Sequence, residues 1–274
     1  CMSFRRLVRG SADWPALERV GRELADRYDR DCVRLEFLDA DNWLSTPMVL
    51  DDDRFVKVIT PQNTLVHTVF TTGRNLGAFS AGSEGFFERH ETPYEMARHE
   101  LEATRQVRDL GVNTPEPIEA LAVGDLGVVV AEYLPEFCTL DELDADSCRA
   151  LAPALFDALA TIHDAGLAHG DLRAENVLVL DGELYVIDAT NVSDDGRTDA
   201  RSYDLASALA ALEPLVGATS AVDAALTSYD SDALLAARRF LDFVAIRPDH
   251  DFDAAKLRGE IEKRAAGPPD ADGG

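Results

Sequence analysis

The sequence contains very little lysine, because only three of its 26 basic residues are lysines (Lys57, Lys256 and Lys263) and the others are arginines. Basic residues as a whole are scarce, since 51 acidic side chains oppose them and leave a formal net charge of −25. A surface with this excess of negative charge is repelled by phosphate backbones and anionic lipids. We therefore expect no direct nucleic-acid partner and no membrane partner.

Cysteine and long apolar runs are also rare. The four cysteines, Cys1, Cys32, Cys138 and Cys148, lack both CxxC spacing and the density of a disulfide-rich secreted protein, so we expect reduced thiols. No apolar run reaches the roughly 18 residues of a membrane-spanning helix. The first ten residues lack the apolar centre of a signal peptide. These absences predict a soluble, cytoplasmic protein.

Acidic residues are abundant and occur in clusters such as Asp51-Asp52-Asp53. Together with the use of arginine in place of lysine, this composition is typical of a protein from a salt-loaded cytoplasm. In molar salt the screening length falls to about 3 Å, so a dense acidic surface repels itself little. We interpret the protein as halophilic; the alternative is an acidic protein from a low-salt cell.

The chain of 274 residues is 46% apolar, which suffices for one large domain or two lobes. Its periodicities predict, in order, an amphipathic helix at 14–28, strands at 32–38, 47–50 and 54–60, a helix at 94–110, a strand pair around the turn GDLG, and helices at 149–165 and 200–216. The pattern indicates an α+β fold: a small antiparallel sheet with one key helix, followed by a mainly helical half.

We divide the chain into an N-terminal extension with an amphipathic helix (1–31), a sheet half (32–135), a helical half (136–266) and a disordered tail (267–274). Within the sheet half, residues 61–93 read as an insertion. Its part at 71–85 contains four glycines. This part is either a substrate lid, with Arg74 contacting an anion, or a solvated loop.

Lys57 stands within the apolar run FVKVI, where an ammonium buried without a partner costs several kcal/mol. The helix that follows the insertion offers a partner, because Met96, Glu100, Ala103 and Val107 recur at helical spacing and Glu100 is the only charge in that stripe. We predict that Lys57 pairs with Glu100 and that its compact charge contacts a phosphate. The alternatives are a solvent-facing Lys57 and a Glu100 at the edge of the stripe.

The stretch HGDLRAENVLVLDGELYVID, residues 169–188, brings together three side chains that carry oxygen. Asp171 and Asn176 lie five residues apart in a loop before the strand VLVL, and a turn then returns the chain so that Asp188 ends the next strand near Asn176. Amide and carboxylate oxygens suit a hard cation such as Mg²⁺, and Asp171 can accept a proton. The set predicts phosphoryl transfer, with Asn176 and Asp188 as metal ligands and Asp171 orienting the acceptor.

The run HGDLRAENVLV resembles the catalytic loop of the protein kinase superfamily, and VIDAT stands where a DFG motif follows. The resemblance covers residues 32–216. It implies a bilobal protein-kinase-like fold with ATP and Mg²⁺ as cofactors, bound between the lobes. Lys57 would then be the nucleotide lysine and Glu100 its helix partner. AEYL would be the hinge, with adenine at the backbone of Glu132 and Leu134.

Two features restrict the resemblance to a subgroup of the superfamily. Gly170 replaces the usual arginine, and only 15 residues separate Asp188 from Asp204, without an A-P-E motif. Asp204 is similar to the acid that caps the central helix of the kinase C-lobe. The missing activation segment is shared with RIO kinases and with the small atypical kinase of the archaeal KEOPS complex. The chain therefore resembles a compact archaeal RIO-like kinase or ATPase.

The sequence departs from the kinase pattern in several places. The loop expected to cover the nucleotide, residues 38–47, has no glycine, so the hydroxyls of Ser45 and Thr46 would have to replace it. VIDAT lacks the Phe-Gly of the DFG motif, which predicts slow turnover. Arg173 replaces a lysine of the catalytic loop and is expected to reach the transferred phosphate. His169 is expected to brace the loop by hydrogen bonding, and the other histidines to have no catalytic role.

We expect an ATP- and Mg²⁺-dependent phosphotransferase, either a RIO-like serine/threonine protein kinase or a regulatory ATPase, with an unknown protein or small-molecule acceptor. A nucleotide-binding pseudokinase that serves as an assembly scaffold is one alternative, favoured by the missing glycines and the altered DFG motif. An aminoglycoside-type kinase is another, although the C-terminal helices look too short for its substrate pocket. The intact Asp171, Asn176 and Asp188 favour an enzyme.

Overall fold

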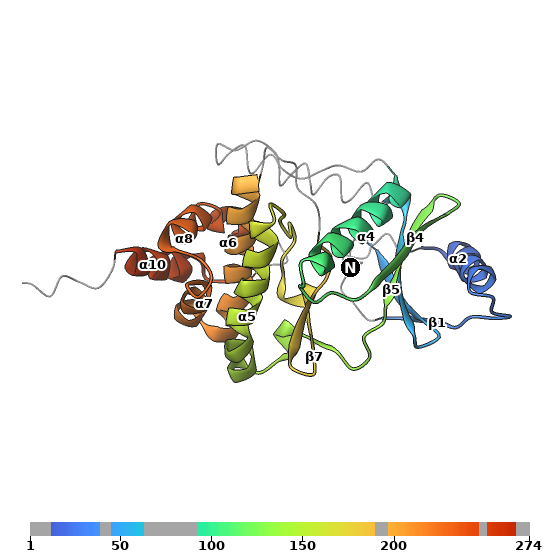
Figure 1. Ribbon diagram of the computed structural model, residues 1–274, viewed down its shortest axis with the longest axis horizontal. Coiled ribbons are helices and arrows are strands. Elements are labelled where there is room, and N and C mark those ends of the chain that lie inside the picture. Colours follow the sequence, from blue (N-terminus) through green and yellow to red (C-terminus); the bar gives the residue numbers. More distant parts are fainter. Residues whose placement is uncertain (1–11, 39–44, 63–91, 190–196, 247–250, 267–274) are drawn as a thin grey trace, which may run out of the picture. The chain divides into compact units, whose positions relative to one another are not determined.

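The computed structural model describes residues 12–38, 45–62, 92–189, 197–246 and 251–266. The chain divides into two compact units, which Figure 1 shows with their helices and strands. The sheet unit contains the described residues up to 62 together with 92–108 and 114–136. The helical unit contains residues 109–113 and the described residues from 137 onward. This division into a sheet part and a mainly helical part confirms the predicted α+β class.

The sheet unit consists of one antiparallel sheet and two helices. Its elements are α2 (Trp14–Arg27), β1 (Leu35–Phe37), β2 (Thr46–Leu50), β3 (Arg54–Ile59), α4 (Pro93–Asp109), β4 (Pro117–Val123) and β5 (Leu126–Glu132). The strand order is β1-β2-β3-β5-β4. The strand predicted at 32–38 is shorter than expected, because only the three residues of β1 pair with β2. The other predicted elements of this unit are present within a few residues.

Side chains of β3 alternate between the two faces of the sheet, as the pleat requires. Val56 and Val58 belong to an apolar cluster with Val20 and Leu24 of α2, while Ile59 packs with Met96, Ala97 and Leu101 of α4 and with Val129 of β5. Figure 1 accordingly shows α2 and α4 on opposite sides of the sheet. The alternation places Lys57 on the same face as Ile59, which is the face that α4 covers.

Gly127 on β5 allows α4 to approach the sheet closely. A Cβ atom at this position would lie 2.0 Å from the carbonyl oxygen of Pro93, the first residue of the helix. The start of α4 is also fixed locally by a capping box, in which the Glu95 amide donates to the Thr92 hydroxyl at 3.1 Å and the Thr92 amide donates to the Glu95 carboxylate at 3.2 Å. These contacts determine where the side chains of the next helical turns meet the sheet.

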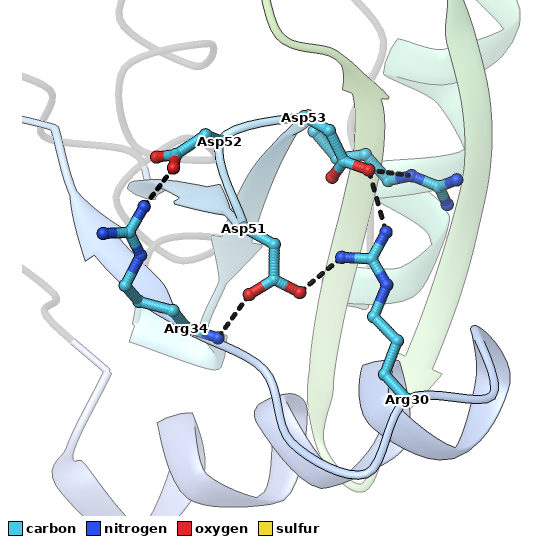
Figure 2. Close-up of polar contacts among 6 residues, drawn as sticks. Arg30, Arg34, Asp51, Asp52 and Asp53 are labelled. Atoms are coloured by element: carbon cyan, nitrogen blue, oxygen red, sulfur yellow. Dashed lines mark hydrogen bonds and ion pairs between the residues drawn. The ribbon is translucent and has the colours of Figure 1, made fainter.

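Arginines from the segment between α2 and β1 hold the acidic turn between β2 and β3 (Figure 2). Asp51 and Asp52 adopt φ angles of 48° and 61°, in the left-handed region. The Arg30 guanidinium pairs with Asp51 and with Asp53, the latter at 2.8 Å. The Arg34 amide donates to Asp51 at 2.7 Å, and its guanidinium pairs with Asp52. The acidic cluster noted in the sequence is therefore neutralised within the fold.

We expect Asp51→Asn to destabilise the protein at neutral pH but not in acid. The Arg34 amide, aided by the Arg30 guanidinium, holds the pKa of the Asp51 carboxyl below its usual value. A group whose pKa is lowered by folding stabilises the fold above its unfolded pKa and loses that contribution as the pH falls through its folded pKa. The variant should melt roughly 2 °C lower at pH 7, and the difference should vanish well below pH of about 4.

Thermal melting of both proteins between pH 7 and pH 2.5 measures this difference. Asp181→Asn is the matched control, because Asp181 is an exposed residue of the turn between two strands and also has a positive φ, 52°. A difference in melting temperature that persists unchanged at pH 2.5 contradicts the assigned role of the Asp51 carboxylate.

The helical unit combines a three-stranded antiparallel sheet with helices. Its elements are β6 (Cys138–Thr139), η1 (Leu140–Glu142), α5 (Ala145–Asp164), η2 (Ala174–Asn176), β7 (Val177–Leu180), β8 (Glu183–Val186), α6 (Arg197–Val216), α7 (Ala218–Ala225), α8 (Ser231–Arg238), α9 (Leu241–Ala245) and α10 (Ala254–Ala265). Helix α6 contacts α5, α7, α8, α9 and α10. Because it is buried on nearly all sides, it forms the centre of this unit.

Two helices begin earlier than the sequence predicts. Helix α5 begins at Ala145, because the Asp144 carboxylate accepts hydrogen bonds from the amides of Asp146 and Ser147 at 3.0 Å and so caps the first turn. Helix α6 begins at Arg197, so Asp204 lies inside the helix and not at its start. The prediction that Asp204 caps a helix is therefore wrong, and its contacts lie elsewhere.

Several sequence expectations concern other parts of the chain. The glycine-rich stretch 71–85 with Arg74, and the tail 267–274, lie outside the described residues. Helix α2, assigned from the sequence to an extension, contributes to the apolar core of the sheet unit. Cys32, Cys138 and Cys148 are free thiols, as expected. In the part of the chain that the structure describes, no helix is long and apolar enough to cross a bilayer.

Candidate active site

The Lys57 ammonium forms an ion pair with Glu100 in the sheet unit. The Nζ and Oε1 atoms lie 2.9 Å apart, and the two side chains are 6% and 17% exposed. Lys57 reaches Glu100 because β3 directs it toward α4. Glu100 reaches Lys57 because Met96, one helical turn before it, packs with Ile59 of the sheet. The predicted pairing is confirmed, and the solvent-facing alternative for Lys57 is excluded.

The burial of the Lys57–Glu100 pair indicates a role other than stability, because a buried ion pair contributes little net stabilisation. Removing two charges from water costs about as much as their attraction returns, and breaking such a pair costs roughly 3–5 kcal/mol. Stability alone therefore does not explain a lysine at position 57 in a chain in which all but three basic residues are arginines. A positioned ammonium is better explained by a ligand that needs a compact positive charge.

The end of β5 carries the two residues predicted to contact adenine, with Glu132 as the last residue of the strand and Leu134 just after it. The Glu132 amide donates to the Glu116 carbonyl at 2.9 Å, so adenine recognition at Glu132 would use the carbonyl oxygen. The Glu132 carboxylate also accepts a hydrogen bond from the Glu116 amide at 3.0 Å, which fixes the segment against the chain before β4. Leu134 is buried, with 6% exposure. Their role in adenine binding stays a prediction.

The hydroxyls predicted to replace a glycine-rich loop lie at the start of β2. Ser45 is buried, and within the described part of the chain its hydroxyl oxygen makes no hydrogen bond. The Thr46 hydroxyl accepts a hydrogen bond from the Ala12 amide at 3.4 Å. Residues 39–44, which form most of the predicted loop, lie outside the described residues.

In the helical unit, the loop HGDLRAEN is held by the buried carboxylate of Asp204. The amides of His169 and Gly170 donate to its two oxygens at 2.5 Å and 2.8 Å. Gly170 has a φ of 82°, a conformation that glycine adopts without strain, so both amides can point at one carboxylate. Asp204 therefore anchors the backbone immediately before Asp171.

The His169 ring braces the same loop, as predicted. Its Nε2 lies 2.9 Å from the Ile187 carbonyl oxygen, and its Nδ1 accepts a hydrogen bond from the Asp171 amide at 3.3 Å. These partners fix the proton on Nε2, since a carbonyl accepts and an amide donates. Burial lowers the pKa of His169, so the ring remains neutral at physiological pH. It links the loop to the segment that carries Asp188.

Asp171, Arg173 and Asn176 are brought together by the turn η2. Arg173 Nε lies 3.5 Å from Asp171 Oδ2, and Arg173 Nη2 donates to Asn176 Oδ1 at 3.4 Å. The Asn176 amide group donates to the Asp171 carbonyl at 2.8 Å, which locks the buried side chain with its oxygen toward Arg173. The three side chains thus form one cluster in which a cationic group faces two oxygen-bearing groups.

Asp188 lies two residues after the end of β8, in a segment whose backbone contacts Asn176. The Ile187 amide donates to the Asn176 carbonyl at 3.0 Å, which brings the two strand ends together. Asp188 adopts a φ of 60°, uncommon for a residue with a side chain. Strained backbone of this kind persists only where surrounding contacts impose it, and it is frequent at functional sites. Asn176 and Asp188 offer oxygen donors of the type that Mg²⁺ prefers.

Sequence reasoning assigned no role to His163, which is fully buried at the end of α5 and lies 3.2 Å from Asp204. A signal was available, because Phe156, Leu159 and His163 recur at helical spacing and His163 is the polar member of that apolar stripe. The same reasoning identified Glu100. Tyr229, which contacts His163, is 66 residues away in the sequence and has no such local signal.

Several known proteins resemble parts of this chain. A family model for the RIO domain matches residues 77–203, a range that includes Glu100, Asp171 and Asp188 but not Lys57. A probable bifunctional tRNA threonylcarbamoyladenosine biosynthesis protein of Haloquadratum walsbyi is 35% identical over 94 residues, which are 34% of this chain and 16% of that protein. The KEOPS complex subunit Bud32 of Pyrococcus abyssi is 27% identical over 116 residues, covering 40% of this chain and 51% of Bud32.

The chain therefore spans a small part of the first relative and about half of the second. Among solved structures, the kinase domain of Mycobacterium tuberculosis PknI aligns over 85% of this chain and 95% of its own at 12% identity, with a TM-score of 0.43. The PAN3 pseudokinase of Neurospora crassa aligns over 86% of this chain and 63% of its own at 15% identity, with a TM-score of 0.42. These low scores carry no argument about the chain. Over residues 77–203, which are less than half of its length, the chain is similar to RIO-type members of the protein kinase-like superfamily.

Proposed function

We propose that this protein is an ATP- and Mg²⁺-dependent phosphotransferase, acting as a RIO-like serine/threonine protein kinase or as a regulatory ATPase. The observation that carries the proposal is the buried pair of Lys57 and Glu100, with Nζ and Oε1 2.9 Å apart. In a protein that uses lysine at only three positions, a lysine held under a helix is best explained by the phosphates of a nucleotide.

The other residues of the sheet unit would position the nucleotide. We assign the phosphates to Lys57, with Glu100 holding the ammonium in place. We assign the adenine to the carbonyl oxygen of Glu132 and the backbone of Leu134. The buried Ser45 hydroxyl would contact a phosphate in place of a glycine-rich loop. These assignments are supported by the burial of Lys57, Leu134 and Ser45.

The loop of the helical unit would supply the chemistry. We assign to Asp171 the orientation of the acceptor hydroxyl or water and the removal of its proton. Arg173, 3.5 Å from Asp171, would contact the transferred phosphate. Asn176 Oδ1 and the Asp188 carboxylate fit a magnesium ion by the chemistry of their oxygens. When bound there, the metal neutralises charge on the phosphates.

A second candidate function is a nucleotide-binding scaffold without phosphoryl transfer. The motif VIDAT lacks the Phe-Gly of the DFG motif, and one relative is a subunit of a protein complex. We therefore also propose that the protein works within a protein assembly. The carboxylate of Asp171 favours the enzyme over the scaffold, because binding alone does not require a proton acceptor.

Incubation with γ-labelled ATP and Mg²⁺ in molar KCl tests the two functions. We expect label on the protein or as free phosphate, because Asp171, Asn176 and Asp188, the residues assigned to proton transfer and metal binding, are all present. The signal should disappear with EDTA and in Asp188→Asn, which removes a metal-binding charge. Asp181→Asn, in the nearby turn, should behave like the native protein. ATP binding without label in any product favours the scaffold, and absence of both contradicts the proposal.

A further inference from the structure

A chain of buried hydrogen bonds runs from Tyr229 to the loop that carries Asp171. The Tyr229 hydroxyl lies 2.8 Å from His163 Nδ1, and His163 Nε2 lies 3.2 Å from Asp204 Oδ2. The side chains of His163 and Asp204 have no exposed surface. Asp204 in turn accepts the amides of His169 and Gly170. The chain thus connects the corner between α7 and α8, through α5 and α6, to the loop.

The partners determine the direction of each hydrogen bond. Asp204 already accepts two amides, so its carboxylate acts as an acceptor and His163 Nε2 must donate to it. In a neutral imidazole the other nitrogen then accepts, which makes the Tyr229 hydroxyl the donor. Burial, together with the nearby Asp204 carboxylate, raises the pKa of Tyr229 far above its usual value, so its proton is retained. Arg201 and Asp164 are the other charged groups that act on the phenol.

Tyr229 is itself held rigidly. Its amide donates to the Ala225 carbonyl at 2.9 Å, and the next residue, Asp230, caps α8 by accepting the Ala233 amide at 2.8 Å. Its ring packs edge-on against Phe156, with centroids 6.4 Å apart. The hydroxyl therefore presents a fixed donor to His163, and it does so from outside the loop and outside the range matched by the RIO-domain model.

We propose that Tyr229 is a positioning residue for the catalytic loop: its hydroxyl fixes the tautomer and ring orientation of His163, and His163 thereby fixes the Asp204 carboxylate that holds the amides of His169 and Gly170. His163 and the amide of His169 share Asp204 Oδ2, so a rotation of the imidazole changes the position of the oxygen that anchors the loop. Only the effect of Tyr229 on turnover rests on the proposed function.

The Tyr229→Phe variant tests this inference because it removes the hydroxyl and keeps the ring contact with Phe156. Without the donor, His163 Nδ1 becomes a buried acceptor without its tyrosine partner. We expect the ¹⁵N chemical shift of His163 Nδ1 to move away from the value of a hydrogen-bonded acceptor. We also expect amide hydrogen exchange at His169 and Gly170 to accelerate roughly tenfold. Amides of α10, such as Leu257, should exchange at the native rate. Tyr185→Phe, on β8 of the same unit, is the control.

Activity gives a second readout, which a general loss of stability would not produce. In Tyr229→Phe we expect kcat to fall roughly tenfold and the KM for ATP to stay at the native value, since Tyr229 touches no proposed ATP-binding group. Unchanged His163 resonances and unchanged exchange at His169 and Gly170 overturn the inference. Exchange that accelerates equally at Leu257 also overturns it, because Tyr229 then stabilises the whole unit. If the native protein transfers no phosphate, the proposed function fails, while the exchange experiment still decides this inference.

Discussion

Asp171→Asn should lower the rate of phosphoryl transfer by roughly 10²- to 10⁴-fold, the range that a positioned proton acceptor contributes. Asparagine has nearly the same shape as aspartate and can still accept a hydrogen bond from Arg173, which lies 3.5 Å from the Asp171 carboxylate. The Asp171 backbone keeps its contacts with His169 and Asn176, because these use main-chain atoms. The change therefore removes the proton acceptor without removing the loop.

The measurement compares kcat with the affinity for ATP. We expect ATP affinity within about twofold of the native value, because Asp171 is not assigned to nucleotide binding. Asp164→Asn is the matched control: Asp164 is an aspartate of the same unit, 81% exposed and paired with Arg201 at 3.5 Å. If Asp171→Asn and Asp164→Asn transfer phosphate at the same rate, Asp171 has no catalytic role and the scaffold function is favoured.

Transfer of the protein from molar KCl to low salt should unfold it. The screening length grows from about 3 Å at 1 M to about 30 Å at 0.01 M salt. Repulsion within a chain of net charge −25 then acts across the whole molecule. Ion pairs such as Arg30 with Asp53 and Arg27 with Glu119 strengthen at low salt, but exposed pairs contribute only about 0.2–1 kcal/mol each. We expect the repulsion to prevail.

Circular dichroism during dialysis, followed by return to molar KCl, measures this salt dependence. A variant with fewer negative charges should stay folded at lower salt. Glu102→Gln combined with Asp109→Asn neutralises two exposed acids of α4 and should shift the unfolding midpoint to lower KCl. A melting curve that does not depend on KCl removes the proposal that the protein is halophilic.

The sequence was most informative where a charged residue interrupts the apolar pattern of a strand or helix. Lys57 was identified because an ammonium is out of place in an apolar strand, and Glu100 because a carboxylate is out of place in an apolar helical stripe. The two-residue repeat of a strand and the 3.6-residue repeat of a helix are properties of the backbone, so the faces that they predict are also found in the folded protein. The same approach would have found His163 but gave no account of Asp204, which was misread as a helix cap.

Boundaries of elements were less predictable than the elements. Strand β1 is shorter than its apolar run, because pairing with β2 involves only three residues. Helices α5 and α6 start earlier than their apolar stripes, because a cap such as Asp144 and the first polar turn extend a helix beyond its buried face. These boundaries depend on hydrogen-bond partners that hydrophobic periodicity does not reveal.

The sequence by itself determined the α+β class, the pairing of Lys57 with Glu100, and the spacing of Asp171, Asn176 and Asp188, because each depends on backbone periods or on residues close together in the chain. Only the tertiary structure decided that Asp204 anchors the loop and that Tyr229 reaches it through His163. A buried polar group needs a partner, but the identity of that partner depends on which helices pack together, and no local pattern in the sequence specifies that choice.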